Sequence, residues 1–471
     1  MDNALRMVVN AGSFRDPSGQ IFEIDGEIYR SVFKPGADDF EAARDAGVYH
    51  KLMETGLLLP HEESDMGDLA PEDTVYCLMH PRLPMISYPW EWPFSLLKDA
   101  ALIHLKAMEK LLPDGFWLRD ASAFNTQYDG DRLRLIDTLS VGRRIPDSPW
   151  IAYGQFCSHF LAPLALAAYG DIRTLSLWRN YIDGYPLDLV ARFLPFWRRY
   201  RPGIFMHLIL HARAQSMADR KEDIGKTRSI KKAKVNDRGL AGIVHSLHKT
   251  IEGIKWKRTS KIWEEYGGIR TYQAEDVAKK SDYVDKVVKR LKPKVVWDLG
   301  ANTGEFSLIA ACNGAFVVSI DGDPACSEYL YQKVFGGNGV KRVLPLTMDL
   351  SNPSPGLGWN SKERLSLSER GPADLVLALA LIHHLVFSSC VPLGLTAQWL
   401  SSLGKNLLVE FVPPEDPMVR KLLQNRREEH LAYNLDVFET SFGKHFDFED
   451  KTELQNGRIL FLCKRSREDG K

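Results

Sequence analysis

The sequence predicts an α/β protein, with a doubly wound parallel sheet in its carboxyl-terminal part and a separate α+β domain in its amino-terminal part. Two apolar runs, each ending in an acid, flank a glycine turn and a helical stretch between residues 294 and 321. Further short apolar runs recur after residue 340, and such runs are typical of parallel strands that are buried on both faces. The length of 471 residues favours two or three domains.

The stretch from 294 to 321 carries the strongest local signal. Its first residues, up to Leu299, are mostly apolar and predict a buried strand with Asp298 near its carboxyl end. Gly300 and Gly304 bracket a turn before a stretch with helical spacing, and a second apolar strand ends on Asp321. A strand, a glycine turn, a helix and a second strand that ends in an acid form half of a doubly wound nucleotide-binding sheet.

The chemistry of this turn indicates what kind of nucleotide it binds. Glycines let the backbone approach a ligand closely, and an acid at the end of the second strand can accept both hydroxyls of a ribose. A dinucleotide site has the order G-x-G-x-x-G, with a pyrophosphate at the helix N-terminus, whereas the order here is D-x-G-x-x-x-G. A carboxylate at the mouth of the turn favours a ligand with a cationic end, such as an amino group and a sulfonium.

The string D-L-G-A-N-T-G-E-F-S, followed by S-I-D-G-D, resembles the first two motifs of class I S-adenosylmethionine (SAM) dependent methyltransferases. This resemblance implies a Rossmann-like sheet and SAM as the cofactor. The alternative is a sheet of the same shape that does not bind SAM. The resemblance also implies cofactor-binding roles for the matching positions, which are Asp298, Gly300, Asn302, Gly304, Asp321 and, for the adenine amino group at the end of a third strand, Asp349.

The later strands predict the catalytic residues, because ligands in such sheets bind outside the carboxyl ends of the strands. A fourth strand, at 374–381, leads into His383 and His384, and a fifth strand contains Glu410. A base is needed only if the acceptor must lose a proton, and these three residues are the candidates, with Tyr272 as a further alternative. One of the two histidines can instead pack or cap the strand end while only its neighbour faces the ligand.

The acceptor is less well defined by the sequence. No N-P-P-Y-type motif follows the fourth strand, which disfavours methylation of a nucleobase or amide nitrogen. We expect an oxygen or carbon acceptor on a small-molecule or sugar-like compound. The strings N-P-S-P-G-L-G-W, L-A-L-I-H-H-L and E-F-V-P-P-E-D-P resemble a family of bacterial two-part methyltransferases that are commonly labelled nodulation-protein-like. This likeness covers almost the whole chain, but neither a family label nor a fold identifies a substrate.

In the amino-terminal domain, residues 1–215, the sequence predicts alternating strands and helices. A hairpin is expected at 20–33, a helix at 39–55, a strand at 74–79 and an amphipathic helix at 94–112. The stretch from 150 to 210 is aromatic-rich and has helical spacing. We expect this domain to bind the substrate or a partner.

A second polar constellation lies in this domain. Asp120, Asn125 and Asp137 have the spacing of the catalytic loop and the metal-binding Asp of protein-kinase-like phosphotransferases, which they resemble. Leu118 replaces the usual His, no glycine-rich loop is visible, and Lys34 is the nearest candidate for the strand lysine. We therefore predict no kinase activity. The resemblance allows a retired kinase scaffold, and the residues alone allow a turn in which the side chains cap backbone groups.

Residues 216–265 are predicted to form a basic linker to the methyltransferase domain at 266–471. The linker is either a solvated hinge or a contact for an anionic substrate or RNA, and its few aromatic residues disfavour nucleic acid. Two alternatives to a simple methyltransferase stay open. One is a bifunctional protein with a kinase-like phosphotransferase domain, and the other is an RNA-binding methyltransferase that uses the linker.

Composition bounds the remaining possibilities. Lys plus Arg and Asp plus Glu both number 61, so no whole-chain field indicates nucleic acid or a membrane as a partner. The six cysteines lack a C-x-x-C pair and indicate buried thiols in a reducing compartment. No apolar run reaches the roughly 18 residues of a membrane span, so we expect a cytoplasmic protein. His207 and His211 lack a third ligand, and no metal site is expected. The oligomeric state is left open.

Overall fold

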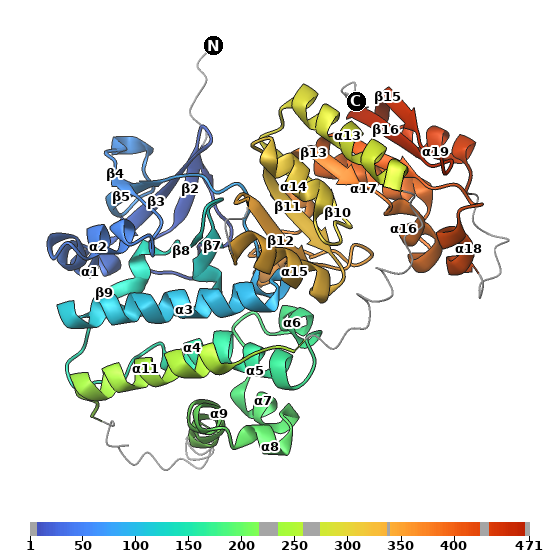
Figure 1. Cartoon of the computed structure of the whole chain (residues 1–471). Coiled ribbons are helices and arrows are strands. Elements are labelled where there is room, and N and C mark those ends of the chain that lie inside the picture. Colours follow the sequence, from blue (N-terminus) through green and yellow to red (C-terminus); the bar gives the residue numbers. More distant parts are fainter. Residues whose placement is uncertain (1–6, 216–233, 258–273, 337–339, 424–432, 467–471) are drawn as a thin grey trace. The chain divides into compact units, whose positions relative to one another are not determined.

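The computed structural model describes residues 7–215, 234–257, 274–336, 340–423 and 433–466. The chain divides into two compact units, of which unit 1 comprises residues 1–257 with 357–364 and unit 2 comprises 258–356 with 365–471 (Figure 1). The linker segments 216–233 and 258–273 lie outside the described residues, and so does the candidate base Tyr272.

Unit 2 is built on a seven-stranded sheet. Five neighbouring strands, β12, β11, β10, β13 and β14, pair in parallel. β16 pairs antiparallel with both β14 and β15. The predicted parallel sheet is therefore confirmed. The strands, in their order across the sheet, are β12 (Val343–Thr347), β11 (Phe316–Asp321), β10 (Val295–Leu299), β13 (Ala373–Ala378), β14 (Gly404–Phe411), β16 (Ile459–Arg465) and β15 (Phe446–Glu453).

The order of these strands creates a switch point between β10 and β13. The chain winds outward from β10 through β11 to β12 and then returns to β13 on the other side of β10. At such a reversal the loops leave the carboxyl ends in opposite directions and open a crevice for a ligand. The predicted glycine turn follows β10 and the two histidines follow β13, the strands that flank this point, whereas Asp321 ends the neighbouring β11.

Helices pack on the sheet and bury an aliphatic core. Val296, Val317, Leu375 and Leu408 of the strands are inaccessible to solvent and pack with residues of the helices, such as Val284. The helices of unit 2 are α13 (Ala274–Leu291), α14 (Glu305–Cys312), α15 (Pro324–Phe335), α16 (Ile382–Ser389), α17 (Leu393–Leu403), α18 (Pro417–Leu423) and α19 (Leu435–Phe442).

The fourth strand is shorter than predicted, and this moves the two histidines. β13 ends at Ala378, and Ala380 has a left-handed φ of 51° that turns the chain. His383 and His384 therefore lie in the first turn of α16 and not at a strand end. The apolar run continues unbroken from strand to helix, and a periodicity argument cannot separate the two in such a run.

Unit 1 begins with a five-stranded antiparallel sheet, ordered β1-β2-β3-β5-β4. The predicted hairpin and strand are confirmed. The single helix predicted at 39–55 is wrong, because Gly47, with a φ of 68°, separates two helices. The elements are β1 (Val8–Val9), β2 (Ile21–Ile24), β3 (Glu27–Phe33), α1 (Lys34–Asp45), α2 (Val48–Glu54), β4 (Glu62–Glu63) and β5 (Thr74–His80).

The rest of unit 1 consists of two small two-stranded sheets, β6 with β9 and β7 with β8, and a set of helices around the long helix α3 (Phe94–Leu111). The strands are β6 (Phe116–Leu118), β7 (Thr126–Tyr128), β8 (Leu133–Leu135) and β9 (Val141–Arg143). The helices are α4 (Tyr153–Phe156), α5 (Ala162–Tyr169), α6 (Thr174–Leu177), α7 (Leu187–Phe193), α8 (Phe196–Arg199), α9 (Pro202–Ile204), the π-helices η6 (Cys157–Leu161) and η8 (Phe205–Leu210), and α11 (Asp237–Gly253).

Helix α11 lies within the stretch predicted as a linker. It packs along α3, as the two parallel ribbons in Figure 1 show. Leu240, Val244, Leu247 and Ile251, three or four residues apart, are buried. This spacing is that of an amphipathic helix, and the many lysines and arginines around it obscured the pattern in the sequence.

Residues 357–364 belong to unit 1 although they lie far along the chain. Arg15 donates two hydrogen bonds to the carboxylate of Glu363, at 2.6 and 3.0 Å. The guanidinium of Arg364 lies 4.2 Å from the centroid of the Phe124 ring.

None of the described helices combines the length and the apolar character that crossing a membrane requires.

Candidate cofactor and active site

The turn after β10 has a backbone shape that glycine permits. Gly300 and Gly304 have φ values of 75° and 78°, and Asn302 between them has a φ of 50°. A Cβ on Gly304 would lie 2.5 Å from the side chain of Leu330, and one on Gly300 would meet Leu381 at 3.3 Å. The loop is therefore a strained, closely packed backbone segment at the carboxyl end of the central strand.

Asp321 joins this loop to the neighbouring strand. One oxygen of its carboxylate accepts the backbone amide of Asn302 at 2.7 Å, and the other accepts the amide of Asp323 at 2.8 Å. Burial raises the pKa of Asp321, and the two amide hydrogen bonds oppose that shift. A carboxylate has about four lone-pair sites, so two sites stay open for hydroxyl groups.

Asp298 is almost fully buried, with 1% of its surface exposed. Ser307 of α14 donates a hydrogen bond of 2.5 Å to its carboxylate. Burial raises the pKa of Asp298 to about 6, although this hydrogen bond and the charge of Lys280 act in the opposite direction. A buried carboxylate with a raised pKa would gain from a cationic ligand, because a nearby positive charge favours the ionised form.

Asp349 follows the third strand, next to the loop after Asp321. Its side chain accepts hydrogen bonds from the amide and the hydroxyl of Ser351, at 2.8 and 2.7 Å. A Cβ on Gly322 would lie 4.0 Å from the Cα of Asp349, so the two loops run close together. The structure thus brings Asp321 and Asp349 to the same edge of the sheet.

Glu410 lies in a buried network of charges. Its carboxylate is 2.6 Å from Nζ of Lys280 and 3.3 Å from Nη1 of Arg458, and Arg458 also bonds to Asp416 at 2.8 Å. All four side chains are at most 4% exposed. Taking up a proton would weaken both of these ion pairs, so the geometry disfavours the predicted role of Glu410 as a base.

The sequence reasoning missed Lys280 and Arg458. Lys280 stands on α13, seven residues before Val287 and on the same face, and its Nζ also lies 4.8 Å from the centroid of the Phe306 ring. A lysine within the apolar stripe of an amphipathic helix is unusual, and this was the signal that could have identified it. Arg458 lies just before the last strand, far along the chain, and the sequence carries no signal for its pairing.

The two histidines have different environments. His383 is 2% exposed, and its Nδ1 has no hydrogen-bond partner among the described residues. Burial, followed by the neighbouring His384, lowers the pKa of His383 to about 3. His384 is half-buried, and burial lowers its pKa as well. The ring centroids are 4.3 Å apart. Because both pKa values are lowered, both imidazoles are neutral at physiological pH, and His384 is the more exposed of the two.

The kinase-like constellation of unit 1 is closed by an arginine. Nη2 of Arg30, on β3, lies 2.9 Å from the carboxylate of Asp137 and 2.6 Å from that of Asp16. The amide of Asn125 also contacts Asp137, at 3.4 Å, while Asp120 accepts the backbone amide of Ser122. Arg30 therefore pairs with Asp137, one of the residues that the kinase-like resemblance would assign to magnesium.

Two further observations bear on that constellation. Lys34, the nearest candidate for the strand lysine, begins α1 and is not on a strand. Glu41 on α1, the acid that would pair with that lysine in a kinase-like lobe, instead accepts a hydrogen bond from the hydroxyl of Tyr76. Among the described residues, no group of three or more His, Cys, Asp or Glu side chains is arranged to hold a metal ion. His207 instead bonds to Tyr153 and Ser246.

Comparison with solved structures finds methyltransferases of low identity. A magnesium protoporphyrin IX methyltransferase from Synechocystis PCC 6803 with bound SAM is 19% identical, over 44% of this chain and 93% of that one, with a TM-score of 0.31. The N-methyltransferase NodS from Bradyrhizobium japonicum WM9 is 9% identical, over 41% of this chain and 99% of that one, also with a TM-score of 0.31. Similarities this weak do not identify a function.

Comparison of sequences gives a clearer result. No family model matches the chain. Nodulation protein NoeA from Rhizobium meliloti (strain 1021) is 36% identical over 463 residues, which are 97% of this chain and 96% of that protein. A similarity of this extent covers both units. The chain therefore belongs to the family of nodulation protein NoeA.

Proposed function

We propose that the chain is a SAM-dependent methyltransferase whose cofactor binds at the carboxyl edge of the unit 2 sheet. The observation that carries this proposal is the carboxylate of Asp321, which holds the amide of Asn302 at 2.7 Å and so fixes the glycine loop beside it. The loop lies at the switch point between β10 and β13, where a doubly wound sheet binds its ligand.

The residues present fit SAM group by group. The open lone pairs of Asp321 suit the ribose hydroxyls, and the buried Asp298 suits the cationic amino end. The exposed Asp349, beside Gly322, suits the adenine amino group. The cofactor would lie against the backbone of Gly300, Asn302 and Gly304. Gly304 has no room for a side chain, because a Cβ there would collide with Leu330.

When bound, SAM supplies a methyl group on a sulfonium, which is transferred by in-line displacement. The task of the chain is then to place the acceptor atom on the line of attack, and such positioning can supply on the order of 7–11 kcal/mol. Water exclusion by the packed loop and by α16 would protect the reacting groups.

His384 is the residue that we assign to proton removal from the acceptor. It is neutral, half-buried and at the start of α16, one residue after the buried His383. A neutral imidazole can take a proton from a hydroxyl or an acidic carbon, so the acceptor atom in this proposal is an oxygen or a carbon of a small-molecule or sugar-like compound. His383, with a pKa of about 3, is a weaker base and would support the neighbouring ring.

Phosphoryl transfer by unit 1 is not part of the proposal. Arg30 occupies the carboxylates of Asp137 and Asp16, so a magnesium ion would have to displace a buried cation. The RNA-binding alternative depends on the basic linker 216–265, of which residues 216–233 and 258–265 lie outside the described residues.

The test is a search for a methylated product. The full-length protein is incubated with isotope-labelled SAM and fractionated metabolite extracts, and products heavier by one labelled methyl group are identified by mass. The proposal expects a labelled sugar-like or other small molecule in the wild-type reaction and none with Asp321→Asn. Label found on the protein itself or on RNA would contradict the assigned acceptor class, and no label in any fraction would contradict the activity.

A further inference from the structure

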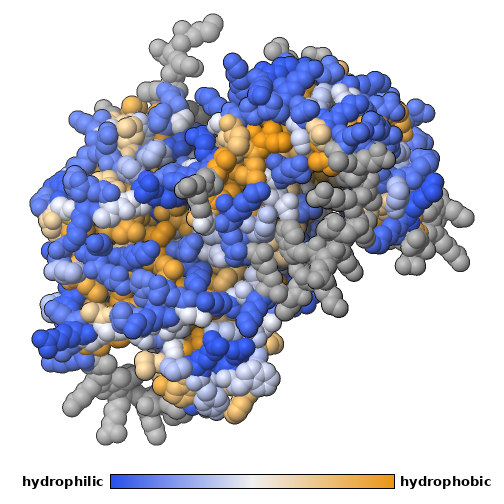
Figure 2. Space-filling view, viewed as in Figure 1, coloured by the Kyte–Doolittle hydropathy of each residue, from blue (hydrophilic) through white to orange (hydrophobic). Residues whose placement is uncertain are grey.

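A patch of exposed apolar side chains lies on unit 1, on α7, α8 and η8. Six large apolar residues between 193 and 210 are 43% to 73% exposed. In Figure 2 the surface over these elements mixes orange and pale residues with blue ones. Side chains of this size and exposure are costly in water when they gather in one place, and such patches mark binding surfaces. The six are Phe193, Phe196, Trp197, Tyr200, Met206 and Leu210.

Arginines are interspersed with these apolar residues. The stretch from 192 to 213 contains five arginines and no acid, and these arginines are Arg192, Arg198, Arg199, Arg201 and Arg213. Arg192 pairs with Asp188 on the same helix at 3.3 Å. Arg198 and Arg201 both lie 5.0 Å from the centroid of the Tyr169 ring, a neutral partner that leaves their charge uncompensated. We call residues 192–213 the aromatic–arginine patch.

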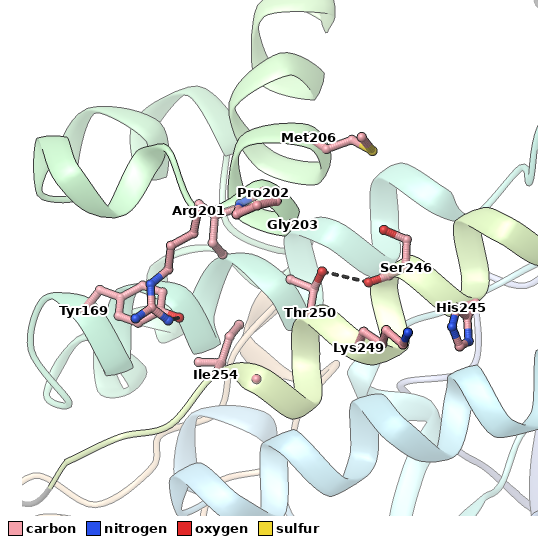
Figure 3. Close-up of a pocket in the computed structure, with 12 residues that line it drawn as sticks. Tyr169, Arg201, Pro202, Gly203, Met206, His245, Ser246, Lys249, Thr250 and Ile254 are labelled. Carbon is pink, nitrogen blue, oxygen red and sulfur yellow. Dashed lines mark hydrogen bonds between the residues drawn. The ribbon is translucent and has the colours of Figure 1, made fainter.

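A groove adjoins the patch and carries further positive charge. It has a volume of about 590 Å³ and is lined on one side by Arg201, Pro202 and Met206 and on the other by residues of α11. In Figure 3 Arg201 and Lys249 line the groove from its two walls, but the Arg201 side chain runs to Tyr169 and the amino group of Lys249 points away from it, toward His245. The walls are packed tightly at their base, where a Cβ on Gly203 would lie 2.0 Å from the hydroxyl oxygen of Thr250.

We propose that the aromatic–arginine patch docks on the surface of an anionic lipid bilayer. Tryptophan, tyrosine and phenylalanine favour the boundary between head groups and acyl chains, and arginines are attracted to anionic lipids. This inference does not depend on the proposed methyltransferase activity. The protein would lie on the membrane and not cross it.

Two other occupants fit the patch less well. A second copy of the chain, related by two-fold symmetry, would bring the same five arginines against each other. RNA would use arginines and rings, but base stacking gives no role to the exposed Met206 and Leu210. The balanced charge of the whole chain hid this local cluster, which is why the sequence predicted no membrane partner.

The experiment is flotation of the full-length protein with vesicles. One set of vesicles is an equal mixture of phosphatidylcholine and phosphatidylglycerol, and the other is phosphatidylcholine alone. The wild-type protein should float with the mixed vesicles and much less with the neutral ones, and added salt should weaken the binding. One basic residue near such a surface contributes about 1 kcal/mol, or roughly a fivefold change in affinity. The double variant Arg201→Gln/Lys249→Gln should therefore lose roughly twentyfold in affinity.

Trp197→Ala should also weaken flotation, and Trp359→Ala is its matched control, because both indoles are 73% exposed and both belong to unit 1. The proposal is overturned if the wild-type protein does not float with anionic vesicles, or if Trp359→Ala loses as much binding as Trp197→Ala. Binding of single-stranded RNA that Trp197→Ala abolishes, without vesicle binding, would assign the patch to RNA. A dimer in sedimentation that Trp197→Ala converts to monomer, again without vesicle binding, would assign the patch to a second copy of the chain.

Discussion

Nζ of Lys280 lies 2.6 Å from the carboxylate of Glu410, and both side chains are withdrawn from water. The pair joins α13 to β14, two elements separated by more than a hundred residues of sequence. Because Arg458 contacts the other oxygen of the same carboxylate, the network fixes the helix before the cofactor strand to the far half of the sheet. Because both ion pairs use the carboxylate of Glu410, we expect this residue to support the fold rather than to take part in the chemistry.

We expect Glu410→Gln to lower the free energy of unfolding by about 3–5 kcal/mol, since it removes the negative charge that faces the two buried cations Lys280 and Arg458. Methyl transfer per folded molecule should change little. Urea denaturation and turnover at low temperature check the two effects. The matched control is Glu449→Gln, which breaks a partly exposed pair with Arg290 in the same unit and should cost less than about 1 kcal/mol. A variant at Glu410 that stays stable but loses turnover would restore the residue as a catalytic candidate.

The two histidines should respond differently to substitution. His384→Ala should keep SAM binding and lose most turnover, because the half-buried imidazole is the one open to an acceptor. His383→Ala should lower the free energy of unfolding by about 2 kcal/mol, since it leaves a cavity under α16. Turnover, calorimetric SAM binding and urea denaturation separate these effects, with His445→Ala as the control. Full turnover in both variants would place the base elsewhere.

Asp298 should give the protein an unusual dependence on pH. Burial raises its pKa from 3.8 to about 6, so the folded chain holds a proton between these values that the unfolded chain has lost. Stability from this group is therefore lost as pH rises from about 4 to 6, by roughly 3 kcal/mol in total. Asp298→Asn should remove that loss. Relative to the wild type, the variant should therefore gain more free energy of unfolding at pH 8 than at pH 4. It should also bind SAM more weakly.

The check is urea denaturation from pH 4 to 8, with Asp374→Asn as a control that should leave the pH slope in this range unchanged. Burial acts to raise the pKa of Asp374, but the hydrogen bond from Lys405 and two backbone amides hold it below the usual value. Its contribution to stability is thus present above the unfolded pKa and lost as pH falls. If Asp298→Asn and the wild type show the same pH slope, Asp298 does not carry the proton.

Unit 1 should not bind magnesium-ATP. The ion pairs of Arg30 with Asp16 and Asp137 occupy the carboxylates, and breaking them with Arg30→Gln should lower the free energy of unfolding by about 3 kcal/mol. A thermal shift assay with magnesium-ATP should show no change in the wild-type protein. A shift that disappears in Asp120→Asn and Asp137→Asn would contradict this and support the phosphotransferase alternative.

The sequence was most informative where the chain repeats a local physical pattern. The strands at 295–299 and 316–321, the glycine turn and the acid at Asp321 were all predictable, because apolar runs and turn glycines are local signals. The start of α16 was not, since one apolar run spans both strand and helix. The pairing of Glu410 with Lys280 was also beyond reach, because a long-range ion pair leaves no periodicity in the sequence.

The same distinction holds in unit 1. The spacing of Asp120, Asn125 and Asp137 suggested a metal site, but the structure places Arg30, from a strand about a hundred residues earlier, against Asp137. Helix α11 was hidden in a stretch whose composition indicates a linker, although its buried leucines have helical spacing. The basic composition of this stretch reflects the exposed face of the helix. The buried face is recognised from its packing against α3.

The account depends most directly on Asp321 as a ligand of SAM, and calorimetry of SAM binding to the full-length protein tests it. We predict that the wild-type chain binds SAM and that Asp321→Asn weakens binding by at least about tenfold, since hydrogen bonds to a charged group contribute about 1.5–3 kcal/mol. Asp374→Asn is the matched control, because Asp374 also accepts two backbone amides, at 2.9 and 3.1 Å, but at the amino end of β13 on the opposite edge of the sheet. It should bind SAM as the wild type does. Absence of binding by the wild-type protein, or equal binding by Asp321→Asn, would contradict the account.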